Sequence, residues 1–379
     1  MKNKIMVNFE LMRIISMLMI VLWHIIIHGG FDNVVDNYGR LFDIILAIII
    51  VHVNSFVILM GFFQYKKKFK FNKILNLLGV SWFYRIFFVL IFAFCFHYIY
   101  AADILALNIM PIDMNDNYWF IMKYVLLYAL CPFLNALINN IGKKQHFVLL
   151  ILLFICFSVL PLFSGDSIIL NDGHSLIQMI TLYFIGAYLG KYSIFDHCFI
   201  KKMSSKKRTV ISIFIFILCA FLNLALYKLG IIMQRFDGSF LHIIGDNFVS
   251  YRLNYSNPII IIQTVAYFYI FWNLKIKNNL LSKIVLMISP YCLGVYLITE
   301  NKLVKQFVYE FLHLNTNYFN YTLEYVLYML LMMFLIFIIC IVIERIRAFI
   351  FKILGKMKML KKIKMYINYY TDKINEVVS

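Results

Sequence analysis

The first long apolar stretch of the chain contains an arginine and two histidines at helical spacing. It runs over residues 8–33 and reads NFELMRIISMLMIVLWHIIIHGGFDN. Arg13 and His24 are eleven residues apart, which on an α-helix is about 20° past three full turns and about 16 Å along the axis. His28 follows one turn later, and Glu10 lies one turn before Arg13. These side chains therefore share one helix face, where such groups are able to transfer protons and bind anions.

Ionisable groups at membrane depth are costly and normally face a helix bundle or a water-filled cavity, so this face is a candidate site. Each residue also has a simpler interpretation. Arg13 is near enough to the helix end to extend to lipid phosphates, His24 could bond another helix as a structural histidine, and His28 could lie exposed at the outer rim. A metal ion is not predicted, because no carboxylate accompanies the two histidines as in an H-E-x-x-H motif.

The composition is that of a membrane protein with many spans. Of the 379 residues, 63% are hydrophobic and 14% are charged, and the mean hydropathy is +0.83. A water-soluble domain of this size needs more polar groups to cover its surface. The seven cysteines are scattered, nearly all in apolar runs, and form no Cys-x-x-Cys pair. They indicate neither a disulfide framework nor a metal site.

Apolar runs long enough to cross about 30 Å of hydrocarbon predict about ten transmembrane helices. The first run exceeds signal-peptide length and is expected to remain as an anchor. We predict an all-α polytopic protein, with a single transmembrane domain at 1–350 and a basic amphipathic tail at 351–379. The expected spans are 9–29, 41–63, 79–99, 118–139, 146–163, 175–191, 209–228, 257–275, 284–301 and 323–345.

Lysine and arginine follow every second predicted span. YKKKFKFNK follows the second span and RIRAFIFKILGKMKMLKKIK follows the last, whereas the first connections on the opposite side are acidic or nearly uncharged. Because basic loops stay inside the cell, both termini are predicted to be cytoplasmic. The tail is expected to be a helix that lies on the membrane surface. The formal net charge of +18 is divided among loops that face anionic lipid heads, so nucleic-acid binding is not expected.

The string FELMRIISMLMIVLWHIIIHGG resembles the first helix of the acyltransferase family 3 membrane proteins, whose signature there is an Arg followed eleven positions later by a His. Similar strings follow in the family's order: SFVILMGFFQYKKKF, YWFIMKYVLLYALCPFLNALI, LYFIGAYLGKY, YSNPIIIIQTVAYFYIF and ISPYCLGVYLITEN. The resemblance covers residues 8 to about 345. The chain departs from it where many relatives carry one or two arginines and this chain has only Arg85. It also has Thr299 where relatives often have a His, which removes one possible polar partner from the site.

The resemblance implies a multi-pass enzyme of a bacterial cell membrane that modifies surface polysaccharides. It would move a small acyl group, typically acetyl, from cytoplasmic acyl-CoA to a hydroxyl of a surface glycan or its lipid-linked precursor. Acyl-CoA is then a co-substrate, and no bound cofactor is expected. Membrane lipids are the other expected partner.

Acyl transfer needs a base for the hydroxyl proton and groups that stabilise the developing oxyanion. His24 suits the base, because the unperturbed pKa of imidazole lies nearest neutrality. Glu300, at the outer end of the ninth span, is expected to orient the imidazole as the carboxylate of a triad does. It has the plain alternative of a glutamate at an aqueous interface.

Substrate binding is assigned to four further residues. Arg13 and Arg85 are expected to bind the donor, since a guanidinium binds phosphate bidentately. Asn117 and Trp119 belong to a family-like string and are candidates for the acceptor site, although a tryptophan there is also a common interfacial anchor.

A transporter or flippase of polysaccharide intermediates is the alternative function, with the polar face of the first helix as a proton relay or substrate path. Two observations weigh against it. The sequence shows no fixed-period repeat, and it has only five prolines, where a transporter with broken helices would want more.

Overall fold

The computed structural model describes residues 6–29, 39–96, 118–164, 171–192, 202–314, 322–355 and 358–378. Every regular element in these ranges is a helix, which confirms the all-α class. The chain divides into two compact units, and each unit combines stretches that are far apart in the sequence. Unit 1 consists of Met1–Met19, Gly39–Lys67 and Leu137–Ser289. Unit 2 consists of Ile20–Tyr38, Lys68–Ala136 and Pro290–Ser379.

Two helices contribute to both units. α1 (Val7–His28) gives its first turns to unit 1 and its last turns to unit 2. α6 (Trp119–Asn140) begins in unit 2 and ends in unit 1. α1 is unbroken from end to end, as its long run of apolar side chains predicts.

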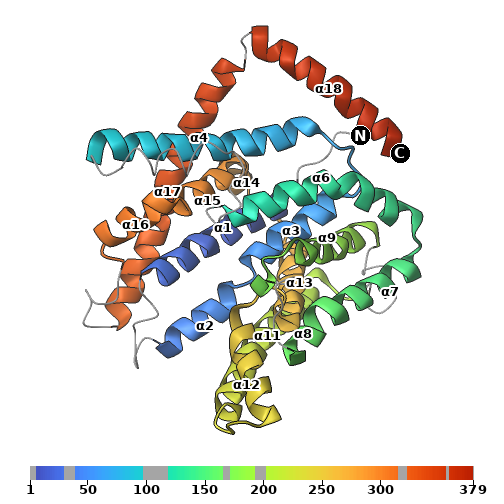
Figure 1. The fold of residues 1–379 in the computed structure, drawn as a ribbon, viewed down its shortest axis with the longest axis vertical. Helices are drawn as coiled ribbons and strands as arrows, with labels where there is room; N and C mark the ends of the chain where they lie inside the picture. Colours follow the sequence, from blue (N-terminus) through green and yellow to red (C-terminus); the bar gives the residue numbers. More distant parts are fainter. Residues whose placement is uncertain are drawn as a thin grey trace. The chain divides into compact units, whose positions relative to one another are not determined.

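Unit 1 is a bundle in which α3 packs along α9, and α11 packs along both α13 and α12 (Figure 1). Its helices, besides the shared ones, are α2 (Gly39–Ile49), α3 (His52–Gln64), α7 (Lys143–Phe154), α8 (Leu160–Ser164), α9 (Leu176–Lys191), α11 (Ser205–Met233), α12 (Phe240–Ser250), α13 (Pro258–Asn273) and α14 (Asn279–Ile288).

The close packing of α3 and α9 depends on two glycines, each of which faces the backbone of the other helix. A Cβ at Gly61 would lie 2.2 Å from the carbonyl oxygen of Tyr183, and a Cβ at Gly186 would lie 2.1 Å from the carbonyl oxygen of Ile58. Small residues allow transmembrane helices to approach in this way, because apolar burial does not drive helix association in lipid.

Polar side chains inside unit 1 bond one another. Ser16 of α1 lies 2.8 Å from the hydroxyl of Ser55 and 3.3 Å from that of Tyr267. All three are buried, so the first turns of α1 are tied to α3 and α13 by hydroxyl groups as well as by apolar contacts.

Unit 2 contains five further helices besides its parts of α1 and α6, in the part of the chain that the structure describes. They are α4 (Phe71–Phe96), α15 (Cys292–Thr299), α16 (Lys302–Phe311), α17 (Thr322–Leu354) and α18 (Lys358–Val378). α15 packs on α17, and both α15 and α16 contact α4.

The contact between α15 and α17 is built around a buried carboxylate. A Cβ at Gly294 of α15 would lie 2.4 Å from Cγ of Glu344 on α17. The carboxylate of Glu344 accepts a hydrogen bond from the Tyr84 hydroxyl at 2.6 Å and bonds from Arg347 at 2.8 and 2.5 Å. A buried charge is tolerated when it is paired and hydrogen-bonded in this way.

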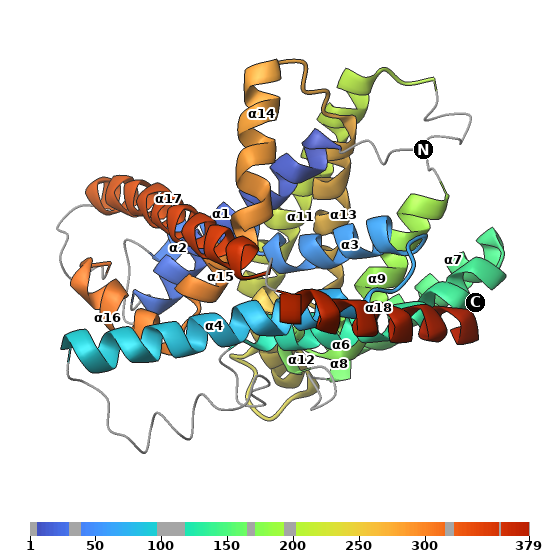
Figure 2. The same ribbon diagram turned by 90° about the horizontal axis from the view of Figure 1, so that it is seen from above.

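The basic tail is helical and returns to the start of α4. The Asn375 side chain of α18 accepts a hydrogen bond from the backbone N–H of Phe69 and donates one to its carbonyl, both at 3.0 Å. Asn72 donates to Asn368 of α18 at 2.5 Å, and Figure 2 shows α18 beside this part of α4. The predicted location of the tail on the cytoplasmic membrane surface stays a prediction, as does the cytoplasmic location of both termini.

Each predicted span contains a helix. Eight helical segments of the described part of the chain are long and apolar enough to cross a membrane, which confirms a polytopic protein. The spans expected at 175–191 and 257–275 correspond to α9 and α13, which have 16 residues each. Three spans are broken within an apolar run: between α2 and α3, at a π-helical turn over Ile155–Val159, and at a 3₁₀ turn over Ser289–Tyr291.

Candidate active site

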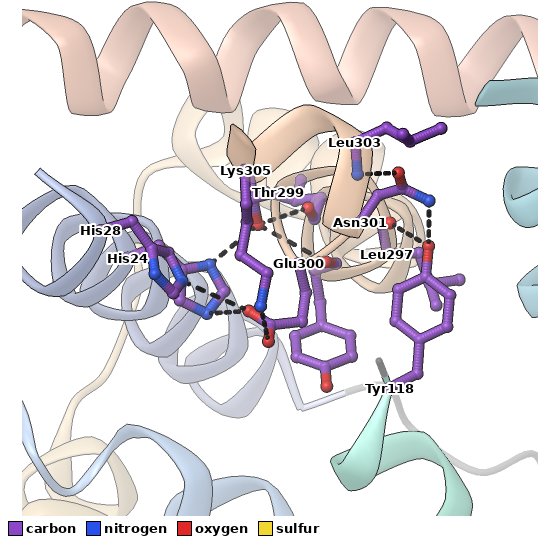
Figure 3. A network of polar contacts seen from close by, with 11 residues as sticks. His24, His28, Tyr118, Leu297, Thr299, Glu300, Asn301, Leu303 and Lys305 are labelled. Carbon is purple, nitrogen blue, oxygen red and sulfur yellow. Dashed lines mark hydrogen bonds and ion pairs between the residues drawn. The ribbon is translucent and has the colours of Figure 1, made fainter. Parts of the chain in front are cut away.

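A histidine of α1 and the glutamate that ends α15 meet in unit 2 (Figure 3). Nε2 of His24 lies 2.9 Å from Oε2 of Glu300, and both residues are 7% exposed. Glu300 is the residue after the last turn of α15, and its backbone N–H still bonds to the carbonyl of Tyr296. The predicted pair of an imidazole and a carboxylate is therefore present in the structure, although their catalytic roles stay predictions.

The second ring nitrogen of His24 also has a partner. Nδ1 lies 3.1 Å from the hydroxyl oxygen of Thr299, and this hydroxyl donates to the carbonyl of Val295 at 2.9 Å. Thr299 stands where relatives often have a His, and it supplies a polar contact of its own to His24. A threonine near the end of a helix keeps its hydroxyl close to the backbone of the preceding turn, and here that hydroxyl also faces α1.

The turn after Glu300 brings a lysine to the same carboxylate. Asn301 caps α16 by accepting the backbone N–H of Leu303 at 3.1 Å, as asparagine commonly does at a helix start. Lys305, in the first turns of α16, then places Nζ 2.6 Å from Oε1 of Glu300. Each oxygen of the carboxylate therefore has its own partner, with Lys305 on Oε1 and His24 on Oε2.

His28 lies at the edge of this cluster. Its Nε2 is 3.9 Å from Oε2 of Glu300, and 27% of its side chain is exposed. Its ring centroid is 5.6 Å from that of Tyr309 on α16. His28 is the most exposed member of the cluster, as the sequence suggested, and its Nε2 also faces Glu300.

The charge of Glu300 follows from its surroundings. Two basic side chains contact the carboxyl group directly, with Lys305 on Oε1 and His24 on Oε2, and His28 lies nearby. Such partners favour the charged carboxylate. When the carboxylate holds a proton on Nε2, the lone pair of a neutral imidazole is on Nδ1, and the Thr299 hydroxyl can then donate to Nδ1 in place of the Val295 carbonyl.

Arg13 lies in the part of α1 that belongs to unit 1. Its Nη1 donates to Oε1 of Glu10 at 2.6 Å, and its guanidinium lies 5.6 Å from the ring centroid of Phe63. The Arg13 side chain is 34% exposed. Since a guanidinium carries five N–H groups in a planar fork, a single bond to Glu10 leaves it with the capacity to bind an anion.

The comparison with family models identifies the chain. A model of an acyltransferase domain matches residues 6–345, which include His24, Glu300 and Arg13. The chain belongs to acyltransferase family 3. Neither the curated proteins nor the solved structures include a match. The match confirms the family suggested by the sequence strings, and the protein is a membrane acyltransferase.

Arg85 of this acyltransferase lies on α4 in unit 2 and is buried. Its guanidinium is 5.2 Å from the ring centroid of Tyr118. The Tyr118 hydroxyl donates to the carbonyl of Leu297 at 2.8 Å and accepts a bond from Asn301 at 3.0 Å. Arg85 is thus linked through a tyrosine to the last turn of α15 and to the cap of α16. Its predicted role in donor binding stays a prediction.

The acceptor-site candidates have different outcomes. Asn117 lies outside the residues that the structure describes. Trp119 starts α6, and a series of ring contacts connects it to His24: Trp119 to Phe120 at 5.8 Å, Phe120 to Tyr296 at 5.8 Å, and Tyr296 to His24 at 6.4 Å between centroids. These rings form an apolar surface that reaches the His24–Glu300 pair, and the predicted role of Trp119 in acceptor binding stays a prediction.

Sequence reasoning missed Tyr118, Asn301 and Lys305. Tyr118 and Asn301 stand next to the assigned residues in the family-like strings YWF and TEN, which was the only signal for them. Nothing in the sequence marks Lys305 as a site residue, because a lysine between two predicted spans is normally interpreted as a solvated or lipid-facing charge.

Proposed function

We propose that this acyltransferase moves a small acyl group, acetyl in the first instance, from cytoplasmic acyl-CoA to a hydroxyl of a bacterial surface polysaccharide or its lipid-linked precursor. The observation that supports it best is the 2.9 Å contact between His24 and Glu300 in a member of an acyltransferase family. A base held by a buried carboxylate is what a hydroxyl acceptor requires.

The reaction uses Nδ1, the ring nitrogen of His24 that does not face Glu300. Nδ1 takes the proton of the acceptor hydroxyl while its oxygen bonds to the thioester carbonyl carbon. The carbon–sulfur bond then breaks, and the imidazolium returns the proton to the departing thiolate of CoA. Glu300 stabilises the imidazolium between these two steps. The acceptor hydroxyl takes the place of Thr299 at Nδ1, and Thr299 keeps its bond to the carbonyl of Val295.

The function is tested by following the acyl group. Membranes that contain the protein, supplied with acetyl-CoA labelled in the acetyl group, are expected to incorporate the label into glycan or lipid-linked saccharide. Membranes with the same amount of His24→Gln protein are the control. A transporter or flippase would move saccharide without incorporating the label, and that result would overturn the proposal.

Arg13 is the proposed contact for a phosphate of the donor. Replacing it with Ala is expected to raise the KM for acyl-CoA about 10- to 100-fold, because a hydrogen bond to a charged group contributes about 1.5–3 kcal/mol. Arg13→Lys, which keeps the charge without the fork, is expected to have an intermediate KM. The measurement is initial rate against acyl-CoA concentration at a fixed acceptor level.

Arg345 provides the matched control for Arg13, because it is an exposed arginine at the predicted cytoplasmic end of α17. Arg345→Ala is expected to leave the KM unchanged. If Arg13→Ala likewise has the KM of the unaltered protein, Arg13 is a lipid anchor and the donor binds elsewhere.

A further inference from the structure

Two histidines and a carboxylate of unit 2 converge in a manner that the proposed reaction does not need. Each of His24, His28 and Glu300 offers a ligand atom that lies within 4.8 Å of the other two. The histidines are four residues apart on α1, which puts both rings on one helix face. Figure 3 shows both rings turned toward the carboxylate. Acyl transfer requires one base, and His28 is an additional imidazole.

The spacing agrees with a tetrahedral metal ion. Zinc binds imidazole nitrogen at about 2.0–2.1 Å and carboxylate oxygen at a similar distance, so its ligand atoms lie about 3.3 Å apart. Oε2 of Glu300 lies 2.9 Å from Nε2 of His24 and 3.9 Å from Nε2 of His28. These two separations bracket the required value. Binding one ion requires side-chain rotations that bring all three atoms, which now lie within 4.8 Å of one another, to about this separation.

The contact between Nδ1 of His24 and Thr299 is also typical of a histidine that binds a metal. A histidine that binds a metal through one nitrogen usually donates the N–H of the other to an oxygen. Nδ1 of His24 lies 3.1 Å from the Thr299 oxygen, whose own proton is directed to the carbonyl of Val295. Thr299 can therefore accept the Nδ1–H when Nε2 holds the ion.

The sequence argument against a metal ion rested on the missing carboxylate. The structure supplies a carboxylate from the end of α15. Glu300 is far from α1 in the sequence, but its carboxylate contacts His24 of α1. Two imidazoles and one carboxylate are a donor set that suits zinc, with the fourth position left for water or substrate.

We propose that His24, His28 and Glu300 form a binding site for Zn²⁺, and that zinc bound there inhibits acyl transfer. Inhibition follows because the ion occupies the side chain that acts as the base and the carboxylate that orients it. The inhibition rests on the proposed function of His24, whereas the binding of zinc does not.

Lys305 limits the affinity of the site. Its Nζ lies 2.6 Å from Oε1 of Glu300, so a divalent ion on Oε2 meets a positive charge across the same carboxylate. The site is therefore suited to reversible occupation by zinc rather than to a permanently bound structural ion.

The direct test is zinc binding by the purified full-length protein in detergent without acyl donor or acceptor. The unaltered protein is expected to bind one Zn²⁺ that excess Mg²⁺ does not displace, since imidazole ligands select zinc over magnesium. His28→Gln is expected to weaken this binding about 100-fold or more, because even loss of an outer contact costs 10- to 100-fold. His242→Gln is the matched control. His242 is a partly exposed histidine 3.5 and 3.6 Å from Asp237 and Asp246, and its loss is expected to leave the zinc affinity unchanged.

A second measurement needs no variant. Zinc is expected to protect His28 of the unaltered protein from carbethoxylation, as read by mass spectrometry of its peptides, with the reactivity of His242 unchanged. Equal zinc affinity in His28→Gln and unaltered protein, or no protection of His28, would overturn the site. Inhibition is measured separately, as the ratio of activities with and without zinc. A protein that binds zinc but catalyses no acyl transfer would overturn the proposed function and leave the zinc site standing.

Discussion

His24→Gln is expected to lower acyl incorporation per folded molecule by a factor of about 10²–10⁴, the usual contribution of a positioned base. The amide keeps much of the shape of imidazole and can still bond Glu300, but it has no basic nitrogen. Protein level and membrane insertion are expected to stay near normal, because a hydrogen-bonded amide is tolerated at a buried polar position. The measurement is incorporation of labelled acetyl, normalised to the amount of folded protein.

The control for this variant is a buried histidine with a structural contact. His146 of α7 is fully buried, and its Nε2 lies 3.2 Å from the carbonyl of Phe184. His146→Gln is expected to reduce the amount of folded protein without lowering the activity of each molecule. If His24→Gln behaves in the same way, His24 is a structural residue and the proposed mechanism is wrong.

Glu300→Gln is expected to lower activity per folded molecule by a factor of about 10²–10³, the cost of removing one preorganised group that stabilises charge. The neutral amide cannot stabilise the imidazolium of His24, and it leaves Lys305 without its counter-ion. Glu344→Gln is the matched control, since Glu344 is a buried carboxylate paired with Arg347 on α17. Its loss is expected to affect stability rather than the activity of each folded molecule.

The double variant of His24 and Glu300 separates a joint role from two independent ones. Residues that act as a unit have strongly non-additive effects, so the double variant is expected to be little worse than His24→Gln alone. If the two losses multiply instead, Glu300 does not act through His24, and the carboxylate requires another role.

Hydropathy made the membrane-length helices of the fold predictable. Apolar runs predicted a helix in each of the ten spans, because crossing lipid requires a helix with internally satisfied backbone groups. The break between α2 and α3 was not predicted. The string IIIVHVNS contains His52, Asn54 and Ser55, but the run over 41–63 is apolar enough as a whole to be read as one span.

The candidate site was predictable in part. The spacing on α1 placed Arg13 and His24 on one face, and the position of Glu300 at the outer end of the ninth predicted span pointed to it as a partner. The approach of Thr299 to His24 and of Lys305 to Glu300 was not foreseen, because both depend on how α15 ends and α16 begins. The cap by Asn301 fixes that turn. Its geometry depends on a few backbone dihedral angles, which hydropathy does not report.

Gly294 controls the position of Glu300, although it lies outside the candidate site itself. The glycine allows α15 to rest against the carboxylate of Glu344, and a methyl group there would overlap with the Glu344 side chain at 2.4 Å. Relief of that overlap requires α15 to move away from α17, and Glu300 would move with the helix that it ends. The distance between the Glu300 carboxylate and His24 therefore depends on the absence of a side chain at Gly294, six residues earlier in the chain.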